Sequence, residues 1–186
     1  HFVLQSRPEF KSVKDLKGRS IGVTTFGSGP ELVGRIMFKH LGLDPDKDVK
    51  WVAAGSGEAR LARMQQGLLD AAITSVPSDY HGKKMGFPVL VRSEDLFSYP
   101  FSGLTVPAKK IKEKPDEVKR VIRAGIKANR YLRANRDGTI AVLMPTYRID
   151  KEAASAAYDS FNKGFNLDGS LPEDGFRRLL DDTKRV

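Results

Sequence analysis

The chain has 186 residues, of which 40% are hydrophobic and none is cysteine. This composition is typical of one globular domain or two small lobes, and it excludes disulfides, catalytic thiolates and zinc–thiolate sites. The net charge of +9 favours small anionic ligands. Because the basic residues are spread along the chain and are densest on one face of a predicted helix, we expect no nucleic-acid partner.

The first hundred residues alternate between strand and helix patterns. Short apolar runs predict strands, and apolar residues spaced three and four apart predict helices between them. The predicted strands are 20–23, 49–53, 70–74 and 88–91, with a further extended run at 103–106, and the predicted helices are 30–43, 58–69 and 78–85. Strands separated by single helices pair in parallel through right-handed crossovers. The pattern therefore predicts a doubly wound, mainly parallel α/β sheet.

From Pro115 the pattern is almost wholly helical. A long helix carries an apolar stripe through Val118, Ile122 and Leu132, and three shorter helices follow at 139–144, 151–161 and 172–183. These helices have apolar faces but no strands of their own, and an apolar face must be buried against another layer. Either they pack on the first sheet, or the element that they normally cover is missing.

The loop at 24–29 is the first candidate for a binding site. It joins a predicted strand to a helix that begins at Pro30. Backbone N–H groups at a helix start have no intrahelical acceptor and carry partial positive charge, which suits a carboxylate, sulfonate or phosphate group. Glycines let a ligand approach the backbone closely, and hydroxyl groups add donors. The predicted ligand-binding residues of this loop are Thr24, Thr25, Gly27, Ser28 and Gly29.

Two later loops have the same character. Residues 54–57 and 75–78 each follow a predicted strand, contain small and hydroxyl-bearing residues, and precede a helix. Ligands of doubly wound sheets bind at the carboxyl ends of the strands. We therefore predict one shared binding surface, with Ser56 and Ser75 as further contacts and Ser56 also as a helix N-cap. Tyr99, near the return of the chain, is a candidate for stacking on the ligand.

No sequence pattern indicates catalysis or metal binding. The three histidines, His1, His40 and His81, do not share metal-ligand spacing with other His, Asp or Glu residues. The Gly-Ser-Gly of the first loop also lacks the G-x-S-x-G nucleophile elbow. Trp51 is predicted in the core, and Asp70, at the far end of its strand from the loops, is predicted to be structural. We therefore predict a non-enzymatic protein with no cofactor and no metal.

Five segments resemble, in order, the solute-binding proteins of ABC importers for nitrate, sulfonates, taurine and thiamine precursors. They begin with Val-Lys-Asp-Leu-Lys-Gly-Arg-Ser-Ile-Gly-Val and lie at 13–23, 26–29, 41–49, 60–72 and 111–118. The resemblance extends over residues 11–186. It implies the type II periplasmic-binding-protein fold, in which two α/β lobes close on a ligand through a hinge.

The resemblance also implies a division of the chain. In this family the segment like 13–23 opens the second lobe, and half of the first lobe precedes it. Residues 19–99 would then form the ligand-binding second lobe. Residues 1–18 and 100–186 would be the crossover and helices of an incomplete first lobe, in an N-terminally truncated chain. Alternatively, a second copy of the chain covers the exposed helices as a homo-oligomer.

The function implied by the resemblance is that of an extracytoplasmic solute receptor, periplasmic or membrane-anchored. It would capture a small anionic or polar organic ligand for ABC permease subunits without chemistry. Two alternatives share the fold: the effector-binding domain of a transcription regulator, and an enzyme like the pyrimidine-precursor synthases. That enzyme would need a segment rich in Cys and His, and the chain has no Cys. A DNA-binding helix pair or a signal segment upstream would separate regulator from receptor.

Overall fold

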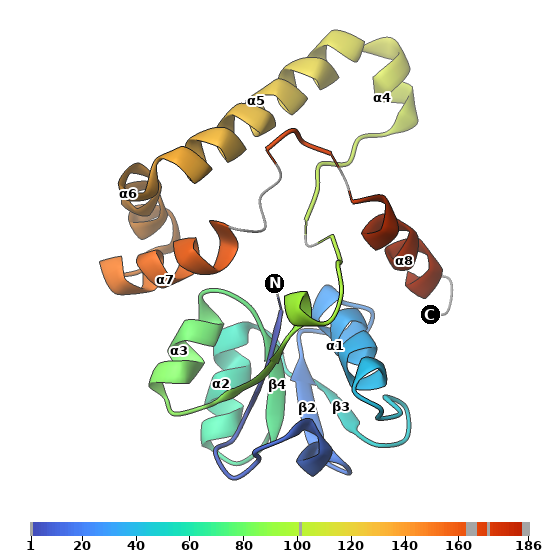
Figure 1. The fold of residues 1–186 in the computed structure, drawn as a ribbon, viewed down its shortest axis with the longest axis vertical. Helices are drawn as coiled ribbons and strands as arrows, with labels where there is room; N and C mark the ends of the chain where they lie inside the picture. Colours follow the sequence, from blue (N-terminus) through green and yellow to red (C-terminus); the bar gives the residue numbers. More distant parts are fainter. Residues whose placement is uncertain (1, 101, 163–166, 171, 184–186) are drawn as a thin grey trace. The chain divides into compact units, whose positions relative to one another are not determined.

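The structure, a computed structural model, describes residues 2–100, 102–162, 167–170 and 172–183. It divides into two compact units, one formed by His1–Ser98 with Leu180–Val186 and the other by Tyr99–Leu179. The first unit contains the sheet, and the second is built from helices (Figure 1).

The first unit alternates strands and helices much as the sequence predicts. Its strands are β1 (Val3–Ser6), β2 (Ser20–Val23), β3 (Lys50–Ala53), β4 (Ala71–Thr74) and β5 (Val89–Arg92). Its helices are α1 (Gly29–His40), α2 (Gly57–Gln65) and α3 (Ser78–Lys84), with 3₁₀ turns at Val13–Leu16 and Ser93–Asp95. The predicted bounds of β2 hold to the residue, and the other predicted elements before residue 93 differ from the observed ones by a few residues at their ends.

The five strands form one sheet in the order β3-β2-β4-β1-β5. β2 pairs in parallel with β3 and β4, whereas β1 is antiparallel to both β4 and β5. Four strands therefore run in one direction and β1 runs against them. α1 covers one face of this sheet, and α2 and α3 cover the other (Figure 1). The prediction of a doubly wound, mainly parallel sheet is confirmed.

β1 differs from what the sequence predicts. Residues 1–18 are expected in the other lobe, but residues 3–6 form a strand inside this sheet, where Val3 lies opposite both Thr74 of β4 and Arg92 of β5. All four residues of β1 are buried. A strand of four residues covered on both faces shows no polar–apolar alternation, so periodicity cannot reveal it.

The two faces of the sheet are packed differently. On the α1 face, Gly34 lies so close to the sheet that a Cβ atom there would be 2.9 Å from both Ile73 Cγ1 and Trp51 Cη2. The ring centres of Phe38 and Trp51 are 5.6 Å apart in an edge-on contact, so Trp51 packs against this layer, although it is half-buried rather than in the core as predicted. The α2 face holds an apolar cluster formed by Ala54, Leu61, Met64, Leu69, Ala72 and Phe87.

Asp70 fixes the ends of two parallel strands opposite the loops. Its Oδ2 accepts hydrogen bonds from the Ser20 backbone N–H at 2.9 Å and from the Ser20 hydroxyl at 2.8 Å. Burial alone raises the pKa of Asp70, but these hydrogen bonds, with the charges of Arg7 and Arg19, outweigh it and hold the pKa below its ordinary value. The structural role predicted for Asp70 is therefore confirmed by its contacts.

We expect Asp70→Asn to lower the free energy of unfolding at pH 7 by about 1 kcal/mol, because charge-assisted hydrogen bonds become neutral ones. A carboxyl with a lowered folded-state pKa stabilises the fold above its unfolded pKa of about 3.9, and this contribution is lost as the pH falls through the folded-state pKa. The difference in the free energy of unfolding between wild type and variant, measured by urea unfolding, should therefore shrink below about pH 4. A difference that does not change with pH would contradict this role.

Asp79→Asn is a matched control, for which we expect the free energy of unfolding at pH 7 to rise rather than fall. Burial raises the pKa of Asp79, so its ionised form opposes folding near neutral pH. The Asp79 Oδ1 that accepts the Tyr80 N–H has an equivalent acceptor in asparagine. This variant should therefore be more stable than wild type at pH 7, and the gain should diminish as the pH falls below the raised pKa.

The second unit is helical and contains no strand in its described residues. Its helices are α4 (Ala108–Glu113), α5 (Pro115–Ala134), α6 (Arg136–Tyr147) and α7 (Lys151–Phe161), and α8 (Glu173–Thr183) is divided between this unit and the first at Leu180. The extended run predicted at 103–106 does not pair as a strand, and α4 is not predicted. A small core of Ile140, Ala154 and Tyr158 joins α6 and α7. Along α5, by contrast, Val121 and Ile122 of the apolar stripe remain 47% and 48% exposed.

Candidate functional site

Three loops meet at the carboxyl edge of the sheet: loop 1 (24–29), loop 2 (54–57) and loop 3 (75–78). Loops 1 and 2 are joined by a hydrogen bond from the Gly55 N–H to the Thr24 carbonyl oxygen at 3.1 Å. Loops 2 and 3 are in close contact, since a Cβ atom at Gly57 would lie 2.6 Å from Ser78 Cβ. The structure thus brings the three predicted loops into one continuous surface. Ligand binding there remains a prediction.

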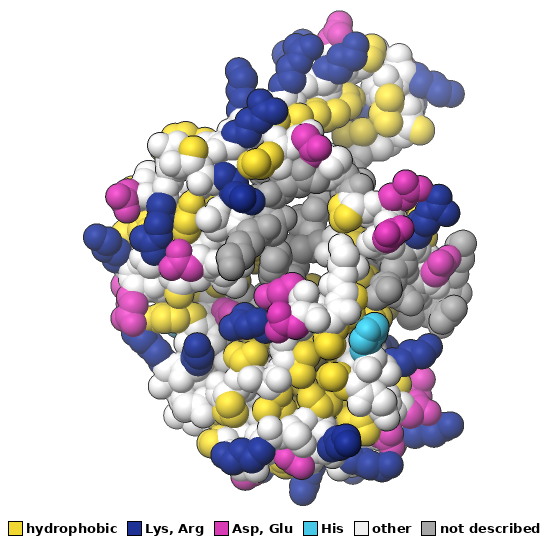
Figure 2. Space-filling model, viewed as in Figure 1, with side chains coloured by type: hydrophobic (Ala, Val, Ile, Leu, Met, Phe, Trp, Pro, Cys, Tyr) yellow, Lys and Arg dark blue, Asp and Glu magenta, His cyan; other side chains and the backbone are white. Residues whose placement is uncertain are grey.

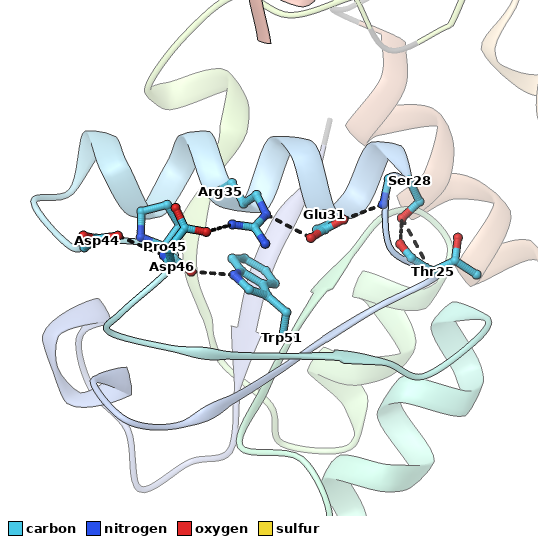
Figure 3. A network of polar contacts seen from close by, with 9 residues as sticks. Thr25, Ser28, Glu31, Arg35, Asp44, Pro45, Asp46 and Trp51 are labelled. Carbon is cyan, nitrogen blue, oxygen red and sulfur yellow. Dashed lines mark hydrogen bonds and ion pairs between the residues drawn. The ribbon is translucent and has the colours of Figure 1, made fainter. Parts of the chain in front are cut away.

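Polar groups of loop 1 form hydrogen bonds within the loop and to the first turn of α1 (Figure 3). Gly27 has a φ of +74°, which turns its N–H back toward α1. That N–H donates to Glu31 Oε2 at 2.5 Å. The Ser28 hydroxyl donates to the Thr25 carbonyl oxygen at 2.6 Å, which closes the turn before the helix.

Glu31 changes the electrostatics expected for the start of α1. It lies in the first turn of the helix and is only 5% exposed, so its carboxylate already neutralises the positive end of the helix. The Gly27 N–H and the Ser28 hydroxyl, which the sequence offers as ligand donors, both have partners within the chain. Glu31 gives no signal in the sequence, because an acidic residue in a first helical turn is common.

A network extends from Glu31 away from the loops (Figure 3). Arg35 donates to Glu31 Oε1 at 2.9 Å and pairs with Asp46 at 2.5 Å, and its guanidinium lies 5.4 Å from the centre of the Trp51 ring. Burial alone lowers the pKa of Arg35, but its hydrogen bonds to the two carboxylates outweigh this and raise the pKa. Trp51 in turn donates its indole N–H to the Pro45 carbonyl oxygen at 2.7 Å. The network ties α1 to β3 and is structural.

Arg60 lies where loops 1 and 2 join, and it is only 4% exposed. Its Nη1 donates to Thr24 Oγ1 at 2.8 Å and to the Gly55 carbonyl oxygen at 2.6 Å. Both acceptors are neutral, no carboxylate of the described residues pairs with it, and its buried Nε has no partner. Burial accordingly lowers the pKa of Arg60. Among the residues that the structure describes, this buried cation therefore has no counterion.

The local sequence explains how Arg60 reaches this position. Ser56 caps α2 as predicted, with its hydroxyl accepting the Ala59 N–H at 3.2 Å, and this places Arg60 one turn into the helix. The side chain runs past Gly22 of β2, where an added Cβ atom would be in ordinary contact with Arg60 Cγ and Cδ at 3.4 Å but would clash with Leu69 Cδ1 at 2.6 Å. Arg60 is not predicted as a site residue from the sequence, because an arginine in an amphipathic helix resembles its exposed neighbour Arg63.

The other predicted site residues have varied positions. Ser56 is exposed, and Ser75 is half-buried, with its carbonyl oxygen accepting the Asp79 N–H at 3.1 Å. Tyr99 belongs to the second unit, so its contact with the ligand remains a prediction. Phe26, which sequence reasoning did not select, is 64% exposed in loop 1 and offers an aromatic surface to an organic ligand.

The charges on the face shown in Figure 2 do not form a single basic patch. Lys and Arg side chains are spread over the face shown in Figure 2, with Asp and Glu between them. Glu58, in the first turn of α2, is 3.0 Å from His81 Nδ1 on α3. Within the described ranges, no three His, Cys, Asp or Glu residues gather as a metal site, and no helix is long and apolar enough to cross a membrane.

The fold and the position of the loops define an α/β lobe of the periplasmic-binding-protein type. Residues 5–144 match the NMT1-like family, which shows that the chain belongs to that family. No curated protein matches the chain.

Solved structures share this fold. A protein of Bordetella bronchiseptica RB50 is 22% identical, with a TM-score of 0.79, and the match covers 98% of this chain and 62% of that one. The periplasmic aliphatic sulphonate binding protein SsuA from Escherichia coli is 21% identical, with a TM-score of 0.71, over 85% of this chain and 51% of SsuA. The desulfurization enzyme DszB is 17% identical, with a TM-score of 0.61, over 99% and 67%. The chain thus spans about half to two thirds of these proteins.

Proposed function

We propose that this protein is a solute receptor of an ABC importer that captures a small anionic or polar organic ligand. The observation that carries the proposal is the convergence of three small-residue loops at the carboxyl edge of the sheet, the edge where doubly wound folds bind ligands. Membership of the NMT1-like family and the shared fold of SsuA support it. Capture and release require no chemistry at the site.

The remaining features of a receptor belong to the same proposal. The protein acts outside the cytoplasm and delivers its ligand to permease subunits. The exposed stripe of α5 is an apolar face that another layer covers in the receptor. The likeness to DszB shows that an enzyme shares the fold. A test of the receptor function must therefore measure both binding of the solute and whether the solute is converted.

Thermal unfolding of the protein with a panel of small solutes tests this function. The panel contains methanesulfonate, taurine, nitrate, benzoate and a neutral pyrimidine, each at matched ionic strength. A ligand at a hundred times its Kd stabilises the folded protein by about 2.7 kcal/mol, which raises the Tm of a chain of this size by about 5–10 °C. Chromatography of the recovered solute should show it unchanged. Absence of a Tm rise with every solute, or turnover of the one that binds, would contradict the proposal.

A further inference from the structure

We propose that the Arg60 guanidinium binds the oxyanion group of the ligand between the end of β2 and the start of α2, while Glu31 excludes that group from residues 27–29 of loop 1. This rests on the proposed function and names the anion-binding residue within it. The sequence pointed instead to loop 1 as the main site.

Arg60 has the properties of a binding group that lacks its anion. The side chain is almost fully buried, its two acceptors are the uncharged Thr24 hydroxyl and Gly55 carbonyl group, and its Nε has no partner. A buried charge is costly unless it is paired, because the protein interior replaces its hydration poorly. A bound oxyanion would supply the missing counterion. Arginine suits this role because its planar fork donates to two oxygens of a sulfonate or carboxylate at once.

The start of α2 adds donors beside this cation. The N–H groups of Gly57 and Glu58 lie in the first turn of a nine-residue helix, where no intrahelical acceptor exists. Ser56 takes up only the Ala59 N–H. The Glu58 side chain, the acidic group of this turn, is engaged by His81 on α3 at 3.0 Å. An oxyanion at this point therefore meets both the Arg60 charge and the positive end of the helix.

The start of α1 has the opposite character. The Glu31 carboxylate accepts the Gly27 N–H at 2.5 Å and is fixed on its other side by Arg35 at 2.9 Å. An anionic ligand at Gly27 would displace or face this buried carboxylate, so like-charge repulsion disfavours it. The start of α1 thus carries a buried negative charge, Glu31, and the start of α2 a buried positive charge, Arg60. The ligand's oxyanion is therefore directed to α2.

Isothermal titration with methanesulfonate and with acetate tests the proposal on the whole protein. The variants are Arg60→Gln, Arg60→Lys and the matched control Arg63→Gln, an exposed arginine on the same helix. Arg60→Gln should weaken binding of the better-bound oxyanion by about 10- to 100-fold, the usual range for a charge-assisted hydrogen bond. Arg60→Lys should recover part of this, since it keeps the charge but loses the fork. The oxyanion affinity of Arg63→Gln should stay within about twofold of the wild-type value, as expected of an exposed charge. The two oxyanions separate sulfonate from carboxylate preference.

If an Arg60 variant does not fold, NMR on the wild-type protein still tests the proposal. The Arg60 Nε–H resonance, followed by nitrogen-15 NMR, should shift on titration with methanesulfonate or acetate, and the shift should saturate with the calorimetric Kd. A purely structural Arg60 predicts no such shift. Glu31→Gln should admit a second, weaker oxyanion at loop 1.

The outcomes separate this inference from the proposed function. Unchanged oxyanion affinity in Arg60→Gln, an unmoved Nε resonance, or binding of neutral solutes alone would overturn the role of Arg60 and leave the receptor function standing. A protein that binds no solute of the panel contradicts the receptor function itself.

Discussion

Replacing Gln5 by methionine is expected to lower the free energy of unfolding by about 2–4 kcal/mol. Gln5 lies in β1, the antiparallel strand within the sheet, and is fully buried. Its Nε2 donates to the Asp79 carbonyl oxygen at 2.9 Å, and its Oε1 accepts from the Thr74 hydroxyl at 2.7 Å. Methionine keeps the length of the side chain but makes none of these bonds. At least two buried polar groups then lose a partner.

Thr74→Val provides the matched control in a double-mutant cycle. If the hydrogen bond between the two side chains is as the structure has it, the combined variant should be less destabilised than the sum of the single ones, because each single variant leaves one partner stranded. Urea unfolding measures all four proteins. A loss of less than about 1 kcal/mol for Gln5→Met, or strict additivity, would contradict the placement of β1 in the sheet.

Among the glycine-to-alanine substitutions in the three loops, Gly57→Ala is expected to disrupt the site most. A Cβ atom at Gly57 would lie 2.6 Å from Ser78 Cβ, a contact that no rotation of the Ser78 side chain relieves. Loops 2 and 3 must therefore separate, which costs about 1–3 kcal/mol of stability. The first turn of α2 moves with loop 2, so we expect oxyanion affinity to fall at least about tenfold. Calorimetry and urea unfolding measure the two effects.

Two further variants isolate the cause. Ser78→Gly in the Gly57→Ala background removes the atoms that the new methyl group meets, and it should restore most of the affinity. Gly103→Ala, where a Cβ atom would have nothing within 4 Å, should change neither affinity nor stability appreciably. Wild-type affinity in Gly57→Ala would show that the contact between loops 2 and 3 does not shape the site.

The elements predicted well from sequence are those with a strong local pattern. β2 and α7 (Lys151–Phe161) have their predicted bounds, because one is a compact apolar run and the other an amphipathic segment with clear limits. β1 was missed because its partners are distant: Val3 pairs with residues 71 and 89 positions away, Thr74 and Arg92. The extended run at 103–106 was predicted from apolar character alone, and the chain provides no partner strand for it among the described residues.

The site was predicted in outline but not in its charges. Loops that follow parallel strands can be located from the sequence, so the meeting of the three loops follows from the strand predictions. Whether a charged side chain points inward depends on what faces it. Arg60 is buried where it donates to Thr24 and Gly55 across loops 1 and 2, and Glu31 is buried where it accepts the Gly27 N–H. Neither relation is visible in the pattern of a single helix.

The most direct test of the central claim is a map of backbone amide shifts in the nitrogen-15 NMR spectrum during titration with the solute that binds. The structure predicts that the largest shifts lie at Thr24, in 55–60 and in 75–78, where the three loops meet around Arg60. Smaller shifts are expected at Gly27 and Ser28, whose polar groups are already engaged. Shifts confined to the basic face of α5, or none at the carboxyl edge of the sheet while the solute binds, would contradict the account.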